Sequence, residues 1–164
     1  MSVETVRQFL APHGLADRIR EFSVSSATVE LAAAAVGTDP ARIAKSLTFY
    51  GKEDFALMIV TAGDQKIDNA KFKASFGYKA KMMSAEDALA STGHAVGGVC
   101  PFALPHGVEV YLDESLHRFD VIYPAAGSAS SAVRLNCDEL FAASKARAWI
   151  DVCKAWRDEE KATQ

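Results

Sequence analysis

The sequence predicts a single α+β domain, and three observations lead to this prediction. The chain has 164 residues, about one domain's worth, with a globular composition of 49% hydrophobic and 24% charged residues. Short helical patterns are interleaved with runs of adjacent strand patterns, which favours a mixed sheet over a doubly wound one. No internal repeat, low-complexity tract or linker divides the chain. We therefore expect residues 1–164 to form one domain.

Helices are indicated by small polar residues that can cap their first turns. Ser2 and Thr28 stand before two such segments, and Pro12 and Gly37 follow them as residues that do not continue a helix. Ser84 with Asp87, and Asn136 with Glu139, resemble capping boxes. The expected helical segments run from Ser2 to before Pro12, and over 29–36, 40–45, 69–76, 85–91 and 137–160.

Strands are predicted where short apolar runs lie between polar or glycine-rich segments. The best defined pair is 46–50 with 55–61, which the polar segment 51–54 joins as a hairpin. The last helix, about 137–160, is expected to pack on the core because its apolar residues recur at three- and four-residue spacing. The remaining strand candidates are 79–83, 95–99, 108–112, 120–123 and 132–135.

Composition excludes several classes of function. The formal net charge of -3 gives no general attraction to polyphosphate, so a nonspecific duplex binder is not expected. The three cysteines form no CxxC pair and the four histidines show no HxxxH spacing, so we predict no disulfide framework, no metal and no cofactor. Apolar stretches fall short of the ~20 residues of a membrane span, and no signal-peptide pattern is present. A cytoplasmic location without membrane contact is expected.

Positive charge is concentrated in one stretch of the chain, diluted there only by Asp64 and Asp68. Charge patterning leaves two interpretations open, a local contact with nucleic acid and a solvated helix face. The lysines of this stretch are Lys66, Lys71, Lys73, Lys79 and Lys81.

The segment that most clearly could take part in catalysis is 93–104, in which Gly97 and Gly98 precede Pro101. Glycine lets the backbone approach a ligand closely, and free amide groups stabilise a developing oxyanion. A tight turn without any ligand fits the same residues, so both interpretations stand on the residues alone.

Four segments of the chain together form a recognisable set. In chain order they are Arg42-Ile-Ala-Lys-Ser-Leu-Thr-Phe, Thr61-Ala-Gly-Asp-Gln-Lys-Ile-Asp, Gly97-Gly-Val-Cys-Pro-Phe, and Tyr123-Pro-Ala-Ala-Gly-Ser followed by Ala132-Val-Arg-Leu. In this order they resemble the YbaK/ProX family, which is also found as the editing domain of bacterial prolyl-tRNA synthetases, and the resemblance covers about 25–140. It implies a mixed, mostly antiparallel, barrel-like sheet with surrounding helices. It also implies hydrolysis of the ester between a small amino acid, such as alanine, and tRNA(Pro).

The resemblance also implies roles for individual residues. Lys45 matches a lysine that contacts the phosphate or ribose at the tRNA end. Gly97, Gly98, Val99 and Cys100 match the loop that wraps the aminoacyl group, and are assigned oxyanion and carbonyl contacts. The further substrate-binding residues are Pro101, Phe102, His94, Gly127, Ser128 and Asp113.

Two alternatives accompany this assignment. Cys100 can be interpreted as a nucleophile activated by His94, although a cysteine between Val99 and Pro101 is more simply a small wall residue. The attacking group is otherwise water or the ribose hydroxyl of the substrate. A noncatalytic module that binds tRNA or prolyl-tRNA synthetase is the alternative function. The expected partners are aminoacylated tRNA and prolyl-tRNA synthetase, and the expected state is a monomer.

Overall fold

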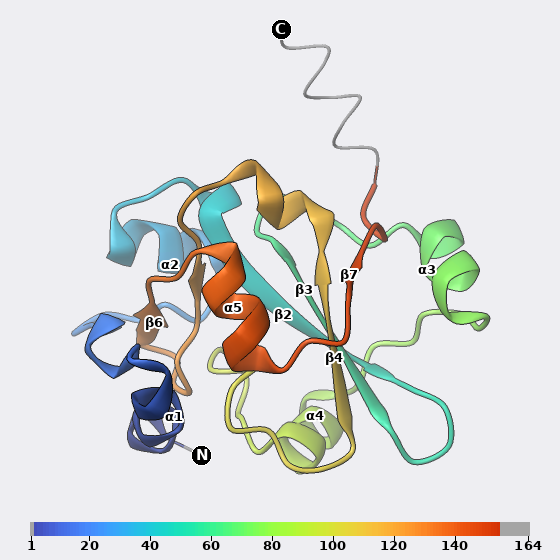
Figure 1. Cartoon of the computed structure of the whole chain (residues 1–164), viewed down its shortest axis with the longest axis horizontal. Helices are drawn as coiled ribbons and strands as arrows, with labels where there is room; N and C mark the ends of the chain where they lie inside the picture. Colours follow the sequence, from blue (N-terminus) through green and yellow to red (C-terminus); the bar gives the residue numbers. More distant parts are fainter. Residues whose placement is uncertain (1, 155–164) are drawn as a thin grey trace, which may run out of the picture.

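The computed structural model describes residues 2–154 and contains a five-stranded sheet beside a two-stranded one (Figure 1). The large sheet has the order β5-β2-β3-β4-β7, and the small sheet pairs β1 with β6. The strands are β1 (Ile19–Glu21), β2 (Ile43–Tyr50), β3 (Ala56–Ala62), β4 (Val108–Asp113), β5 (Tyr123–Pro124), β6 (Ser131–Val133) and β7 (Trp149–Ile150).

The longest ladder is the antiparallel hairpin of β2 and β3, which runs from Ala44 opposite Ala62 to Tyr50 opposite Ala56. The shorter pairings of β5 with β2, β4 with β3 and β7 with β4 are parallel. Parallel neighbours need a long connection, and α3 and α4 supply it between β3 and β4. The predicted α+β class with a mixed sheet is confirmed, and the predicted hairpin is present.

Four helices begin at the capping residues that the sequence predicts. The side chains of Ser2, Thr28, Ser84 and Asn136 each accept a hydrogen bond from a backbone amide in the first turn, and Asp68, which was not predicted as a cap, does the same for α3. None of the helices within residues 2–154 has the length and apolar character that a membrane crossing requires. The α-helices are α1 (Val3–Leu10), α2 (Val29–Val36), α3 (Asn69–Phe76), α4 (Ala85–Thr92) and α5 (Cys137–Ser144). The 3₁₀ turns are η1 (Ala11–His13), η2 (Ala16–Arg18), η3 (Pro40–Arg42) and η4 (Glu114–Arg118).

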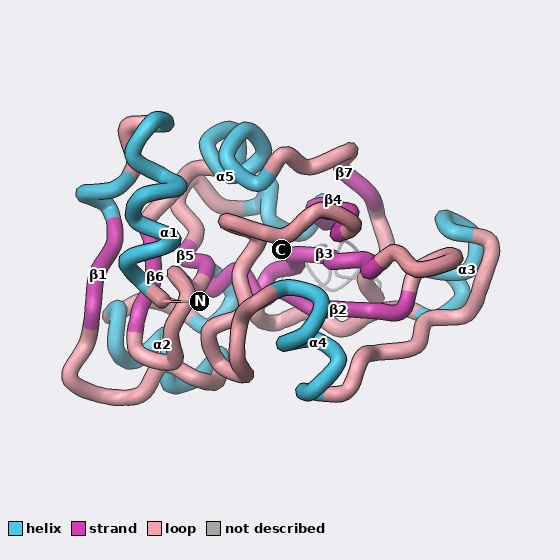
Figure 2. The backbone as a smooth tube through the Cα atoms, turned by 90° about the horizontal axis from the view of Figure 1, so that it is seen from below, coloured by secondary structure: helices cyan, strands magenta, loops and turns pink. Residues whose placement is uncertain are grey.

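Two apolar clusters cover the two faces of the large sheet. Successive side chains of a strand point to opposite faces, so Met58 joins the cluster that contains Leu140 of α5. Its neighbour Ile59 joins the other cluster, with Phe72 of α3. Figure 2 shows α1 and α3 on opposite sides of the central strands. The sheet is therefore buried on both faces, and a ligand site must lie at its ends or edges.

The C-terminal helix is much shorter than predicted. Instead of extending over 137–160, α5 ends at Ser144, where Lys145 adopts a left-handed backbone conformation with φ of 54°. Trp149 and Ile150 then pair with β4 as the edge strand β7. Helical spacing misled the prediction because a short edge strand also needs apolar residues. The rest of the predicted helix, from 155 onward, lies outside the described residues.

Two short strand predictions are also wrong. Residues 79–83 contribute one isolated bridge, between Met82 and Phe49, and residues 95–99 form turns and loop. Their apolar residues are not packed in a sheet, since Met82 is 58% exposed and Val96 is 68% exposed. Both of these side chains lie instead beside the cavity described next.

Candidate functional site

A cavity of about 340 Å³ lies between β2 and the glycine loop, defined here as residues 93–102. One wall is β2 from Ile43 to Thr48, and the loop contributes Val96, Gly97 and Val99. Helices α2 and α4 supply further walls, and most of the residues around the space are small. These small residues are Ser26, Ala27, Thr28, Ala32, Ala44, Ser46, Thr48, Ala85, Ala88, Gly97, Ala125, Ser131 and Ala132.

The cavity is located where one edge of β2 lacks a neighbouring strand. β5 pairs with β2 only at Ile43 and Ala44, and farther along the amide of Met83 donates to the carbonyl of Thr48 at 2.9 Å. Between these contacts, Ser46 lines the cavity. Its hydroxyl is buried and has no hydrogen-bond partner within the described chain. A buried polar group without a partner is costly, so this hydroxyl is ready to bond a ligand.

Lys45 provides the charge of the site. Among the described residues that line the cavity, it alone carries a charged side chain. The side chain is half-buried, and its Nζ donates a hydrogen bond to the main-chain carbonyl of Gln65. Burial lowers the pKa of Lys45, while the carboxylates of Asp64 and Glu30 oppose this change. A cation beside small, uncharged walls suits a ligand that combines an anionic group with a small uncharged one.

Close packing explains the two glycines of the loop. Gly97 has φ of +85°, and a Cβ there would lie 2.9 Å from the Cβ of Ala27. A Cβ on Gly98 would lie 2.9 Å from the Cα of Ser128. The amide of Gly98 donates to Ala95 at 3.0 Å and closes a turn. The amide of Val99 has no hydrogen-bond partner in the described part of the chain, and is the better candidate for an oxyanion contact.

Three of the predicted site residues come together at this cavity: Lys45, Gly97 and Val99. The others do not line it. Pro101 lines a separate cavity beside β4, and Phe102 is fully buried in the core.

Gly127 and Ser128 lie beside a different hollow, next to α1. Gly127 packs so tightly there that a Cβ would lie 2.8 Å from the carbonyl oxygen of Ser2. Ser128 supports the glycine loop through its contact with Gly98. The two residues therefore support the glycine loop and do not line the cavity.

His94 and Cys100 form a buried pair. Both are 0% exposed, and His94 Nε2 lies 3.6 Å from Cys100 Sγ and 2.8 Å from the carbonyl oxygen of Phe102. Burial lowers the pKa of His94 and raises the pKa of Cys100 to about 12. Both groups are therefore neutral near pH 7. Neither lines the cavity, and an inaccessible neutral thiol is a poor nucleophile.

Asp113 has a structural role at the end of β4. One carboxylate oxygen accepts the amide of Ser115 at 2.9 Å, and the other accepts the amide of Val152 at 2.9 Å. The side chain is fully buried and does not line the cavity. Within residues 2–154, no three His, Cys, Asp or Glu side chains gather in a way that could hold a metal ion.

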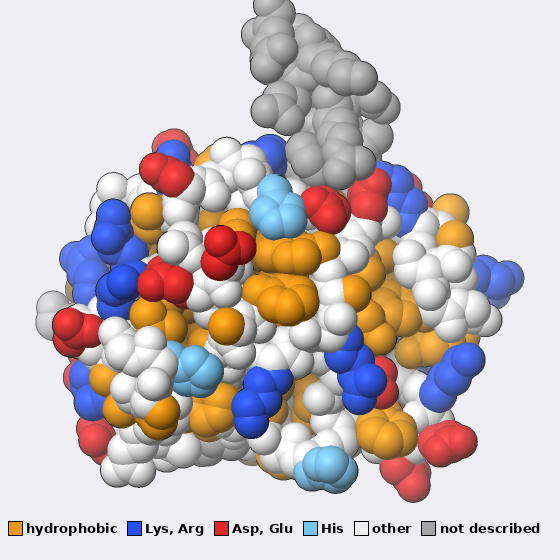
Figure 3. Space-filling model, in the orientation of Figure 1, with side chains coloured by type: hydrophobic (Ala, Val, Ile, Leu, Met, Phe, Trp, Pro, Cys, Tyr) orange, Lys and Arg blue, Asp and Glu red, His pale blue; other side chains and the backbone are white. Residues whose placement is uncertain are grey.

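The lysine-rich stretch does not converge on the cavity. Lys71 pairs with Asp151 at 3.2 Å and donates to the carbonyl of Cys153, and the Lys81 ammonium lies 5.3 Å from the centre of the Tyr50 ring. Lys66, Lys73 and Lys79 are exposed. Figure 3 shows basic side chains dispersed among acidic ones on the face that it presents. A contact between these lysines and tRNA stays a prediction.

Sequence reasoning missed Ser46, although it directly follows Lys45 in one of the four segments. Strand alternation alone places the two side chains on opposite faces, so the sequence gives no sign that both reach one cavity. Both residues nonetheless line the cavity.

Comparison with known proteins decides the family. Residues 24–143, which include both walls of the cavity, match the family described as aminoacyl-tRNA editing domain. The chain belongs to the aminoacyl-tRNA editing domain family. This editing domain is 50% identical to the uncharacterised protein YwhH of Bacillus subtilis (strain 168) over 156 residues, covering 95% of this chain and 99% of that protein.

Solved structures agree with this assignment. One is described as a candidate trans-editing enzyme for prolyl-tRNA synthetase, and it matches with a TM-score of 0.83 at 28% identity, covering 93% of this chain and 97% of that one. Another, the hypothetical protein APE2540, matches with a TM-score of 0.82 at 25% identity, covering 92% of this chain and 99% of that one. The editing-domain fold therefore extends over nearly the whole chain.

Proposed function

We propose that this editing domain hydrolyses the ester of mischarged aminoacyl-tRNA, and that its first candidate substrate is tRNA(Pro) carrying alanine or another small amino acid. The observation that carries the proposal is the meeting of Lys45, Gly97 and Val99 around one cavity with small walls. The family and the related candidate trans-editing enzyme for prolyl-tRNA synthetase support it.

The small walls of the cavity fit the need for editing. A synthetase pocket rejects an amino acid with one methylene less by only ~1–3 kcal/mol, so a second site must remove the smaller product. Such a site excludes the correct amino acid by size. Alanine and serine residues along the cavity leave room for a small side chain, and their packing gives the site fixed dimensions.

The proposed reaction is attack of water on the ester carbonyl carbon. The amide of Val99 stabilises the oxyanion that forms, and the bond to the ribose oxygen then breaks. The ribose oxygen takes up a proton, and the products are the free amino acid and uncharged tRNA. Lys45 holds the anionic end of the RNA. We assign no covalent step to Cys100, because burial keeps its thiol neutral and inaccessible.

The partners follow from the same proposal. Aminoacylated tRNA is the substrate, and prolyl-tRNA synthetase is the enzyme whose errors the domain would correct. A monomeric state stays a prediction.

The proposal is tested by measuring deacylation of alanyl-tRNA(Pro) with wild type, Lys45→Ala and Lys52→Ala. Lys52 is an exposed lysine in the turn between β2 and β3, it does not line the cavity, and it lies outside the lysine-rich stretch, so it serves as the matched control. We expect wild type and Lys52→Ala to act at similar rates, and Lys45→Ala to act about 100-fold more slowly because the RNA end is no longer held in place.

Two outcomes would contradict this proposal. Equal rates for wild type and Lys45→Ala would remove the role of Lys45. A wild-type protein that binds uncharged tRNA(Pro) but leaves the ester to decay at the buffer rate would instead be a noncatalytic binding module.

A further inference from the structure

The ammonium of Lys45 is held by the loop that follows β3. Its hydrogen-bond acceptor is the main-chain carbonyl of Gln65, a residue that is only 5% exposed. Because the acceptor belongs to the backbone, the direction of the ammonium depends on the path of residues 63–66. Whatever fixes this loop also fixes the position of the Lys45 ammonium.

Two contacts fix the loop. The amide of Gln65 donates to the carbonyl of Ala62 at 3.1 Å and closes a turn. The carboxylate of Asp64 accepts two hydrogen bonds from Arg118, at 3.0 Å from Nη1 and 2.6 Å from Nη2. A bidentate pair of this kind restricts orientation as well as distance. The Arg118 side chain is 16% exposed, and the Asp64 side chain is 37% exposed.

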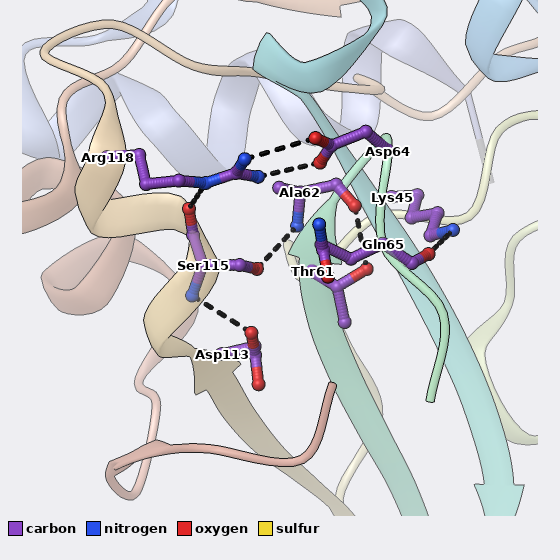
Figure 4. Close-up of polar contacts among 8 residues, drawn as sticks. All are labelled: Lys45, Thr61, Ala62, Asp64, Gln65, Asp113, Ser115 and Arg118. Carbon is purple, nitrogen blue, oxygen red and sulfur yellow. Dashed lines mark hydrogen bonds and ion pairs between the residues drawn. The ribbon is translucent and has the colours of Figure 1, made fainter. Parts of the chain in front are cut away.

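Arg118 is itself tied to the framework of the domain, as Figure 4 shows. Its Nε donates to the carbonyl of Ser115 at 2.9 Å, and the Ser115 hydroxyl accepts the amide of Ala62 at 3.2 Å. The amide of Ser115 donates to the buried carboxylate of Asp113. The guanidinium therefore joins the turn η4, anchored at the end of β4, to the loop that carries Gln65.

We propose that Arg118 and Asp64 are positioning residues for Lys45, and that they hold the Gln65 carbonyl where it directs the ammonium to the cavity. The inference rests on the proposed function of Lys45 and deepens it, because it assigns the activity of the site to a pair of residues that do not line the cavity. Arg118 acts on Lys45 through the loop and through Asp64, whereas Asp64 also acts on Lys45 directly through its charge.

The charges around Lys45 support this role. Burial lowers the pKa of Lys45, Asp64 and Glu30 raise it, and Lys66 lowers it. Cys153 raises it only when ionised, and burial raises the pKa of that thiol so far that it is neutral at physiological pH. Burial also acts to raise the pKa of Asp64, but the hydrogen bonds and charge of Arg118, together with hydrogen bonds from the Gln65 side chain and the backbone, lower this pKa below its ordinary value. The pair thus maintains an anion that favours the charged form of Lys45.

The test compares Arg118→Gln, Arg118→Lys and Asp64→Asn with Arg147→Gln as the matched control. Arg147 also makes a surface ion pair, with Glu109 at 3.4 Å, but it does not line the cavity. We expect Arg118→Gln to lower kcat/KM for alanyl-tRNA(Pro) by about 10- to 100-fold through misplacement of the cation. Arg118→Lys should restore part of this loss, and Arg147→Gln should stay within about twofold of wild type.

Asp64→Asn adds a second measurement, the pKa of Lys45, which a purely structural role of Asp64 would leave unchanged. Removal of the carboxylate lowers the pKa of Lys45 further, so the ammonium loses its proton at lower pH, and the alkaline fall of activity starts at lower pH. The pKa of Lys45, followed by NMR on protein with labelled lysine side chains, should shift downward by the same amount.

The results distinguish a failure of the positioning role from a failure of the proposed function. An Arg118→Gln protein that is folded and has wild-type kcat/KM, or an unchanged Lys45 pKa in Asp64→Asn, would overturn the positioning role. Should Arg118→Gln not fold, Asp64→Asn and Arg118→Lys decide the question. If wild type does not deacylate the substrate at all, the proposed function fails, yet the NMR titration still tests whether Asp64 controls the charge of Lys45.

Discussion

Lys45 and the pair His94–Cys100 are both built from residue types that perform chemistry in enzymes, but their surroundings differ. Lys45 is half-buried, stands at the open edge of a strand and lines a cavity. His94 and Cys100 are 0% exposed, contact each other and bond the backbone of the same loop. Residue type alone makes both regions candidates for the site of reaction. Of these three residues, only Lys45 lines the cavity, so we place the reaction there, and His94 and Cys100 instead pack within the glycine loop and support it.

Among the variants that test this comparison, Gly97→Ala is expected to lower deacylation activity most. The new Cβ would lie 2.9 Å from the Cβ of Ala27, at a φ that strains other residues, so the loop must shift. We expect about 100-fold lower deacylation, because displacement of about 1 Å at a reacting centre has effects of this size.

Gly107→Ala is the matched control for Gly97→Ala. Gly107 has a similar φ of +98°, but a Cβ there meets nothing within 4 Å. Both variants should lose about 1–2 kcal/mol of unfolding free energy to backbone strain, measured by denaturant unfolding. Only Gly97→Ala should lose activity, and equal activity in the two variants would show that the loop does not shape the site.

A smaller loss of activity is expected from Ser46→Ala, which tests whether the open edge of β2 contacts the substrate. The hydroxyl has no partner in the described chain, so its removal should leave unfolding free energy unchanged or slightly higher. A bond to the substrate worth ~1 kcal/mol predicts about fivefold lower kcat/KM.

Ser144→Ala is the control for Ser46→Ala, because it should change stability and not activity. The Ser144 hydroxyl donates to the carbonyl of Phe141 and lies outside the cavity, so its loss should lower stability without lowering activity. A Ser46→Ala enzyme as active as Ser144→Ala would remove the substrate contact from the account.

The smallest effect on activity is expected from Cys100→Ala. The thiol is fully buried and its pKa is raised to about 12, so it takes no part in the reaction at neutral pH. Deacylation should stay within about twofold of wild type, whereas loss of a buried sulfur should lower unfolding free energy by about 1–2 kcal/mol. A loss of activity above about 100-fold in a folded variant would restore the nucleophile interpretation.

Much of the fold was accessible from the sequence because its signals are local. Ser2, Thr28, Ser84 and Asn136 each begin the helix that they were expected to begin. The C-terminal part was not accessible, because Lys145 ends α5 in a left-handed conformation that a lysine gives no reason to expect.

The site was predicted only in part, for a different physical reason. Lys45, Gly97 and Val99 were named through motifs, and they meet at one cavity. Whether Asp113 faces a ligand or caps a turn depends on contacts with Ser115 and Val152. Such contacts join residues far apart in the chain, so local patterns do not reveal them.

The most direct test of the account is the location of the aminoacyl group. An alanyl-adenosine analogue with an amide in place of the ester resists hydrolysis, and its binding can be followed by NMR on isotope-labelled protein. We predict that the signals of Lys45, Ser46 and Val99 shift together as the analogue saturates the cavity between them. Shifts confined to Leu104 and Arg147, which line the separate cavity beside β4, would contradict the account.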